Sequence, residues 1–167
     1  MKAREVYWDC IYARDCLEAA LTERRLKDAK VMWFAALAML RAIGHVLESV
    51  DAKNLGEDFK RLSDRKYREW NESHPIFYGF IKKERDSILK EYDSSLGEET
   101  LREESPLELS DGSLFVLSSG DVLGVTTEFS TLTKQRGELA GESPAEVLTR
   151  ALEWWDQELT LLEDAIK

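Results

Sequence analysis

The sequence is poor in cysteine, proline and glycine. Of its 167 residues, 2 are cysteine, 3 are proline and 9 are glycine. Cys10 and Cys16 lie six positions apart in a helical pattern, about 9 Å along a helix axis, which is too far for a disulfide within the helix. We therefore expect two free thiols and a fold that a hydrophobic core stabilises, since a chain of this length needs no cross-link.

Long apolar runs are also missing. The longest, residues 31–40, has about half the length that spans a bilayer. Residues 1–9 carry charges throughout, unlike the apolar region of a signal peptide. These features predict a cytoplasmic protein without a membrane segment.

Familiar catalytic motifs are absent from the sequence. It has no glycine-rich phosphate loop, no Gly-x-Ser-x-Gly, no Cys-x-x-Cys and no His-Glu-x-x-His. Its two histidines, His45 and His74, fall on different predicted helices, so a metal site would need carboxylates that the fold brings to them. The sequence predicts no metal and no cofactor, and it favours a protein that is not an enzyme.

Charge is distributed unevenly along the chain. The formal net charge is −10, yet residues 1–93 hold 18 basic and 17 acidic side chains, whereas residues 94–167 hold 5 basic and 16 acidic ones. Duplex DNA requires a dominant basic surface, so we do not expect DNA binding. The acidic part raises the alternative of an acidic partner or inhibitor protein that acts on a basic surface.

One stretch is locally basic. Residues 60–68 include five Lys and Arg residues and are followed by Trp70. Such a stretch could contact a nucleic-acid backbone, with the indole as a stacking ring. The other interpretation is a solvated helix face, which is the more common role of charge runs.

Hydrophobic periodicity predicts four helices in the first part of the chain and one at its end. Residues 143–146, Ser-Pro-Ala-Glu, form a capping box that begins the last helix, whose apolar stripe continues to Ile166. The sequence predicts a mainly α, up-and-down bundle of about five helices. The first four cover residues 3–25, 28–50, 56–71 and 75–92.

A small β-hairpin is expected before the last helix. Asp111-Gly112 lies between two short apolar runs, which is a strong local signal for a tight turn. Residues 93–105 have no clear period and predict a loop or short helix, and the stretch from 118 to 141 predicts an irregular excursion without an internal repeat. We expect a single domain, 1–167. Its parts are a four-helix core (1–93), a hairpin and irregular insertion (94–142) and a packing helix (143–167).

Arg85 stands on an apolar stripe. Ile81, Arg85, Ile88 and Tyr92 step by four, three and four, so the guanidinium is placed in line with core residues. A buried guanidinium needs a carboxylate, carbonyls, water or a ligand, because it stays charged and is costly to desolvate. One interpretation is a structural ion pair with Asp86, with Glu48 or with a carboxylate of the last helix, and the other is a functional site.

The segment from Phe80 to Tyr92, Phe-Ile-Lys-Lys-Glu-Arg-Asp-Ser-Ile-Leu-Lys-Glu-Tyr, resembles the signature helix of HEPN-like helical-bundle domains. Members of that family often carry an arginine, then a polar residue, then a histidine a few positions on. Arg85 and Asp86 match the first two positions, and Lys90 stands where the histidine would be.

This resemblance implies a bacterial homodimer. In nuclease members the arginine and histidine assist RNA cleavage, so one hypothesis is a metal-independent ribonuclease of a toxin or defence system that uses Arg85, Asp86, Lys90 and His45. Lysine is a poor general base at neutral pH. We therefore favour a non-catalytic binding or interaction module, with RNA or a protein as partner. Its ligand-binding candidates are Arg85, Asp86, Lys90, Arg41 and His45.

Overall fold

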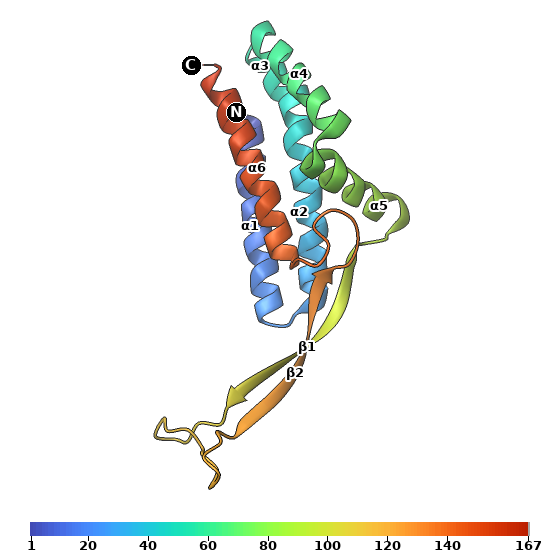
Figure 1. The fold of residues 1–167 in the computed structure, drawn as a ribbon. Helices are drawn as coiled ribbons and strands as arrows, with labels where there is room; N and C mark the ends of the chain where they lie inside the picture. The colour runs from blue at the N-terminus through green and yellow to red at the C-terminus, as the bar shows by residue number, and fades with distance from the viewer. Residues whose placement is uncertain (167) are drawn as a thin grey trace. The chain divides into compact units, whose positions relative to one another are not determined.

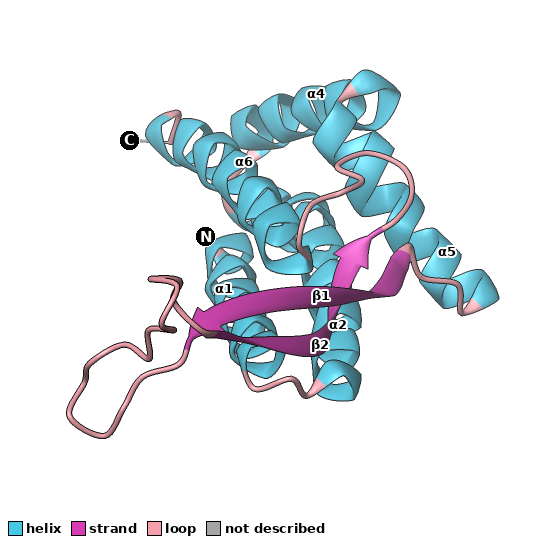
Figure 2. Ribbon diagram, turned by 60° about the horizontal axis from the view of Figure 1, so that its bottom comes forward, coloured by secondary structure: helices cyan, strands magenta, loops and turns pink. Residues whose placement is uncertain are grey.

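The computed structural model describes residues 1–166, apart from the side chain of residue 73. The chain divides into two compact units, one formed by Met1–Gly97 with Leu132–Lys167 and the other by Glu98–Thr131. We call the first the bundle unit and the second the ribbon unit. The bundle unit contains all the helices (Figures 1 and 2).

The helices form the bundle that the sequence predicts. The fold is mainly helical, with five principal helices and a two-stranded antiparallel hairpin before the last one, so the predicted fold class is confirmed. Helix α2 continues without a break through a wide-turn segment, η1, into α3. Their bounds are α1 (Lys2–Thr22), α2 (Leu26–Val46), η1 (Leu47–Asp51), α3 (Ala52–Asn54), α4 (Glu57–Ser73), η2 (Pro75–Lys82), α5 (Lys83–Glu91) and α6 (Pro144–Asp164).

The continuous helix from Leu26 to Asn54 lies at the centre of the bundle. By length and composition it could also cross a membrane, a property that core helices share, and 39% of its most apolar window is buried inside the bundle. Trp33, Leu40 and Ile43 on it are fully buried.

Aromatic rings fill the core between α4, η2 and α6. Trp155 is fully buried and Trp154 is 9% exposed, so both belong to the core. Trp70 meets both rings edge to face, at centroid distances of 5.6 Å to Trp154 and 5.2 Å to Trp155. Such edge-to-face contacts stabilise beyond area burial alone. This end of the core holds α6 against α4.

The start of α6 confirms the predicted capping box. Ser143 Oγ accepts a hydrogen bond from the Glu146 N–H at 3.3 Å, and Glu146 Oε2 accepts one from the Ser143 N–H at 3.1 Å. The stripe from Leu148 to Leu162 is buried as expected. Ile166 is 42% exposed, so the stripe ends before it.

The hairpin differs in position from the prediction. Strands β1 (Leu96–Pro106) and β2 (Gly124–Lys134) pair with each other, whereas the predicted turn at residues 111–112 closes only a short loop with one isolated bridge, Glu108 to Leu114. Residues 93–105 are therefore largely strand, not loop or helix. The acidic composition of β1 concealed it, because glutamate is depleted in strands.

The register of the hairpin follows from the hydrogen bonds at its two ends. Gln135 N–H donates to the Ser95 carbonyl at 2.7 Å, and Leu107 N–H donates to the Leu123 carbonyl at 2.8 Å. The two intervening segments have equal length, so the pairing is uninterrupted. Odd-numbered residues therefore bond across the ribbon, while even-numbered residues direct their backbone N–H and C=O groups outward.

The tip of the ribbon unit contains an eight-residue repeat that the sequence analysis missed. Leu109 N–H donates to Ser113 and Leu117 N–H donates to Asp121, so the same turn recurs eight residues later. Leu-Glu-Leu-Ser-Asp-Gly-Ser-Leu at 107–114 and Phe-Val-Leu-Ser-Ser-Gly-Asp-Val at 115–122 share the underlying pattern. The prediction of no internal repeat is wrong here, because two copies are too few for a clear period.

Candidate ligand-binding groove

The helix that carries Arg85 begins with wide turns. Pro75 begins η2, which has π-helical hydrogen bonding over Pro75–Lys82 before the chain becomes the α-helix α5. Glu84 and Arg85 both lie on α5, three to four positions before Ile88. Glu84 takes the buried position, and Arg85 lies beside the stripe with its side chain 38% exposed. The expectation that Arg85 points into the core is corrected.

Arg85, Asp86 and Lys90 form one polar chain on α5. Arg85 Nη1 donates to Asp86 Oδ1 at 2.8 Å, and Lys90 Nζ donates to Asp86 Oδ2 at 3.1 Å. The hydrogen bond from Arg85, and after it the one from Lys90, lowers the pKa of Asp86 below its usual value. Asp86 is therefore the counter-ion of Arg85, and it fixes the direction of the guanidinium.

Two hollows between α2 and α5 meet at Arg85. One is apolar, with a volume of about 240 Å³, and the other is cationic, with a volume of about 290 Å³. We call them together the α2–α5 groove. The apolar hollow is lined by Phe34, Leu37, Ala38, Arg85, Ile88, Leu89 and Tyr92. The cationic hollow is lined by Arg41, Ala42, His45 and Arg85.

Arg41 lines the cationic hollow and also has a buried donor without a partner within residues 1–166. Its guanidinium lies over the rings of Tyr67 and Phe77, at 5.4 and 5.2 Å from their centroids. Cation–π contacts of this kind hold the side chain in place. Arg41 Nη1 is buried and has no hydrogen-bond partner among the described residues. A buried donor without a partner is costly, and the contacts with the two rings offset part of that cost.

The structure divides the five predicted site residues into two sets. Arg85, Arg41 and His45 line one hollow, whose lining includes no carboxylate. Asp86 and Lys90 line a different hollow, and they connect to the first set through the hydrogen bond to Arg85. The first set suits an anion, because two guanidinium groups offer charged donors and nothing in the lining repels negative charge.

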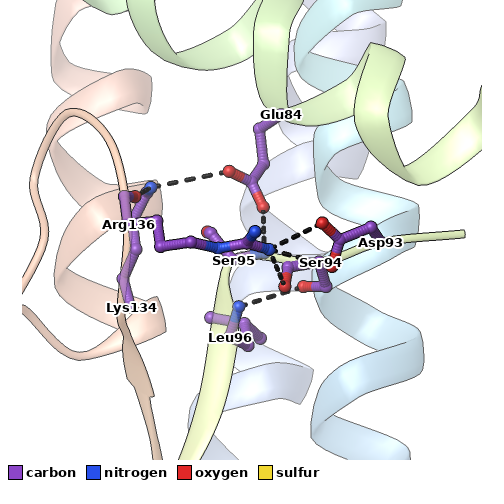
Figure 3. Close-up of polar contacts among 7 residues, drawn as sticks. All are labelled: Glu84, Asp93, Ser94, Ser95, Leu96, Lys134 and Arg136. Carbon is purple, nitrogen blue, oxygen red and sulfur yellow. Dashed lines mark hydrogen bonds and ion pairs between the residues drawn. The ribbon is translucent and has the colours of Figure 1, made fainter. Parts of the chain in front are cut away.

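The buried charge on this helix is Glu84, which the sequence analysis did not single out. Glu84 is 8% exposed and Lys134 is 2% exposed, and Glu84 Oε2 lies 3.5 Å from Lys134 Nζ (Figure 3). Burial lowers the pKa of Lys134, and the charge of Glu84 opposes that effect. Phe80, Glu84 and Ile88 step by four, so the signal was present in the sequence beside the stripe that contains Arg85.

Backbone and side-chain contacts around Glu84 fix the base of the hairpin to α5. Glu84 Oε1 accepts the Ser95 N–H at 2.8 Å, and Lys134 Nζ also donates to the carbonyl of Arg136 (Figure 3). Arg136 Nη2 in turn donates to both carboxylate oxygens of Asp93 at 2.8 Å. All these residues belong to the bundle unit, and together they hold the segments before β1 and after β2 next to each other.

The basic stretch on α4 lacks the stacking ring that nucleic-acid binding would use. Trp70 is 1% exposed and packs in the core. Several cations of the stretch are paired: Lys60 with Asp64 at 3.5 Å and Lys66 with Glu158 at 3.1 Å. The stretch is a solvated helix face, which was the second interpretation.

Searches for relatives leave the site to be interpreted from its own geometry. No protein-family model, no curated protein and no solved structure matches this chain. Within residues 1–166, no group of three or more His, Cys, Asp and Glu side chains is arranged to hold a metal ion. The HEPN-like resemblance stays a prediction, and the α2–α5 groove is the candidate site that the structure provides.

Proposed function

We propose that this chain is a HEPN-like, non-catalytic binding module whose α2–α5 groove takes a ligand with one anionic group and an apolar body. The observation that carries the proposal is the pair of hollows that share Arg85, one cationic and one apolar. Arg41 and Arg85 both line the cationic hollow, whose lining includes no carboxylate, and such an anion would balance their charge.

The cationic hollow would provide the charge recognition. Charge-assisted hydrogen bonds contribute about 1.5–3 kcal/mol each, so a phosphate or carboxylate held by Arg41 and Arg85 gains more than a neutral group does. Asp86 already neutralises part of the charge on Arg85. Arg41, whose guanidinium has no carboxylate within the lining, is therefore the stronger contributor to affinity.

The apolar hollow would provide affinity that increases with the length of the ligand's alkyl chain. Its lining includes Phe34 of α2, and Leu89 and Tyr92, which are 62% and 77% exposed. Covering these side chains with a ligand removes apolar surface from water, at about 0.8 kcal/mol for each buried methylene group. Affinity should therefore rise three- to fourfold, as a rough estimate, with each carbon that enters the hollow.

The experiment is a competition titration with simple amphiphiles. A fluorescent anionic dye, anilinonaphthalene sulfonate, is displaced from the purified chain by octyl phosphate, butyl phosphate, octanol or inorganic phosphate. The proposal expects octyl phosphate to displace best, and Arg41→Met to weaken it about tenfold or more. Arg65→Gln removes an exposed arginine of α4 and is the matched control, which should leave the titration unchanged. Equal displacement by octanol and octyl phosphate would contradict the proposal.

A ribonuclease is the second candidate, and one observation favours it: His45 and Arg85 line the same hollow. In that account Arg85 stabilises the charge on the scissile phosphate and His45 is the general base. Mixed single-stranded RNA should be cleaved by the natural chain and not by Arg85→Ala or His45→Ala. Equal degradation by all three proteins would identify a contaminating nuclease and remove this candidate.

A further inference from the structure

The ribbon unit has two outer edges with different chemistry. Even-numbered residues of both strands direct backbone N–H and C=O groups outward, by the register established above. An open strand edge is a template for pairing with another strand, unless charges or proline block it. The two edges of this ribbon differ in that respect.

The edge of β1 is blocked. Its outward positions include Glu98, Arg102, Glu104 and Pro106, and Pro106 has no N–H to donate. Carboxylates at two of these positions would repel the same edge of a second copy. Strand pairing through β1 is therefore disfavoured.

The edge of β2 carries little charge. Its outward positions from residue 124 to residue 130 are Gly124, Thr126, Glu128 and Ser130. Glu128 is the single charged residue among them, and Arg102 Nε of the same ribbon donates to it at 2.7 Å. The other three outward residues are uncharged and none is proline, so nothing on this edge blocks a second strand.

The ribbon unit also lacks a core. Each residue from 98 to 131 is exposed or half-buried, and apolar side chains on the odd-numbered face such as Leu101, Leu123 and Val125 are 40%, 37% and 48% exposed. Two strands alone are marginally stable in water. A further pair of strands would extend the apolar face and stabilise the ribbon.

We propose that β2 of one copy pairs antiparallel with β2 of a second copy, about a two-fold axis at Thr127, to form a four-stranded sheet β1-β2-β2-β1. This register places Gly124 opposite Ser130 and Thr126 opposite Glu128, so the two Glu128 carboxylates do not face each other. On the apolar face Val125 meets Phe129 of the second copy, a favourable pairing of a β-branched with an aromatic side chain.

The two-fold register commits the dimer to specific pairs. The four outward residues of each strand form about eight hydrogen bonds across the new interface. Thr127 lies opposite Thr127 of the second copy in a pair without hydrogen bonds, where α-carbons are about 4.5 Å apart, within reach of a disulfide. The interface uses none of the residues that line the α2–α5 groove, so a failure of the proposed dimer and a failure of the proposed ligand binding can be told apart.

The mass of the full chain in solution tests the pairing. Light scattering after size exclusion should give twice the monomer mass of 19.2 kDa. Thr126→Glu places a carboxylate opposite Glu128 at two symmetric positions and should weaken the dimer about tenfold or more. Thr126→Pro removes an outward donor without removing a bond inside the ribbon, and should also yield monomer. Thr100→Pro makes the same change on the β1 edge and should remain a dimer.

Cross-linking locates the axis. In a Cys16→Ser background, Thr127→Cys should form an intermolecular disulfide under mild oxidation, whereas Thr131→Cys should not. Circular dichroism confirms that each variant keeps its helices. Three results would each overturn the proposal. A monomeric natural chain would show that there is no dimer. A Thr126→Glu variant that stays dimeric, or equal cross-linking at both positions, would place the dimer interface at other residues.

Discussion

The buried pair Glu84–Lys134 should dominate the stability of the junction between α5 and the hairpin. Both side chains are nearly inaccessible, at 8% and 2% exposure. Replacing Lys134 by methionine leaves the Glu84 carboxylate buried with the Ser95 N–H as its remaining donor. Breaking one partner of a buried ion pair typically costs about 3–5 kcal/mol. For a chain of this size that corresponds to a fall of roughly 6–20 °C in the melting temperature.

The free energy of unfolding should depend on pH in a direction that the pKa of Lys134 determines. Burial lowers the pKa of Lys134 from its usual value of 10.5, and Glu84 partly offsets this shift. The folded state then binds fewer protons than the unfolded state between the lowered pKa and 10.5, so the free energy of unfolding rises with pH across that interval. In Glu84→Gln the offset is lost, so the rise should start at lower pH than in the natural chain.

Urea denaturation followed by circular dichroism measures these effects. The double variant Glu84→Gln with Lys134→Met should recover much of the lost free energy, because neither charge is then left alone. Arg102→Met removes one partner of an exposed pair, 74% and 55% accessible, and should cost at most about 1 kcal/mol. Single variants that each lose less than about 1 kcal/mol, and that add in the double variant, would refute the reasoning.

Three further predictions concern the bundle. Burial raises the pKa of Cys10 to about 12, so a thiol reagent should label Cys16 in the folded chain and Cys10 only on unfolding; labelling of both at one rate would contradict this. Gly44→Ala places a methyl group 3.3 Å from Trp155 and Tyr67; overpacking costs about 1–3 kcal/mol and the helix propensity of alanine returns about 1 kcal/mol, so the free energy of unfolding should fall by up to about 2 kcal/mol in urea titrations. Ser143→Ala removes the cap of α6 and should lower it by about 0.5–2 kcal/mol, whereas an unchanged midpoint would deny the cap a role.

The helices were predictable because periodicity and caps are local. Ser143 and Pro75 each begin a helix as expected, and the apolar stripes predict most of the buried residues. The sequence offers two lines that end at Ile88, one through Arg85 and one through Glu84. Spacing alone does not show that Glu84 is the buried one, because both positions lie within one helical turn of Ile88.

The sequence predicted that a hairpin exists, but it did not show which residues pair. The turn of the hairpin was predicted at Asp111-Gly112, because that dipeptide favours a tight turn. The observed ladder pairs β1 (Leu96–Pro106), which is rich in glutamate, with β2 (Gly124–Lys134), which is rich in threonine. Both strands lie outside the predicted turn. Likewise, the sequence identified Arg85, Arg41 and His45 as candidates, but only tertiary packing reveals that one hollow collects them.

The most direct test of the proposed groove is an NMR titration that observes the arginine side chains themselves. Octyl phosphate is added to isotopically labelled chain while the guanidinium signals of Arg41 and Arg85 and the methyl signals of Leu37 and Ile88 are followed. The account predicts that these four residues shift together along one saturable curve. Shifts confined to the basic stretch of α4, or no saturable shift at Arg41, would contradict it.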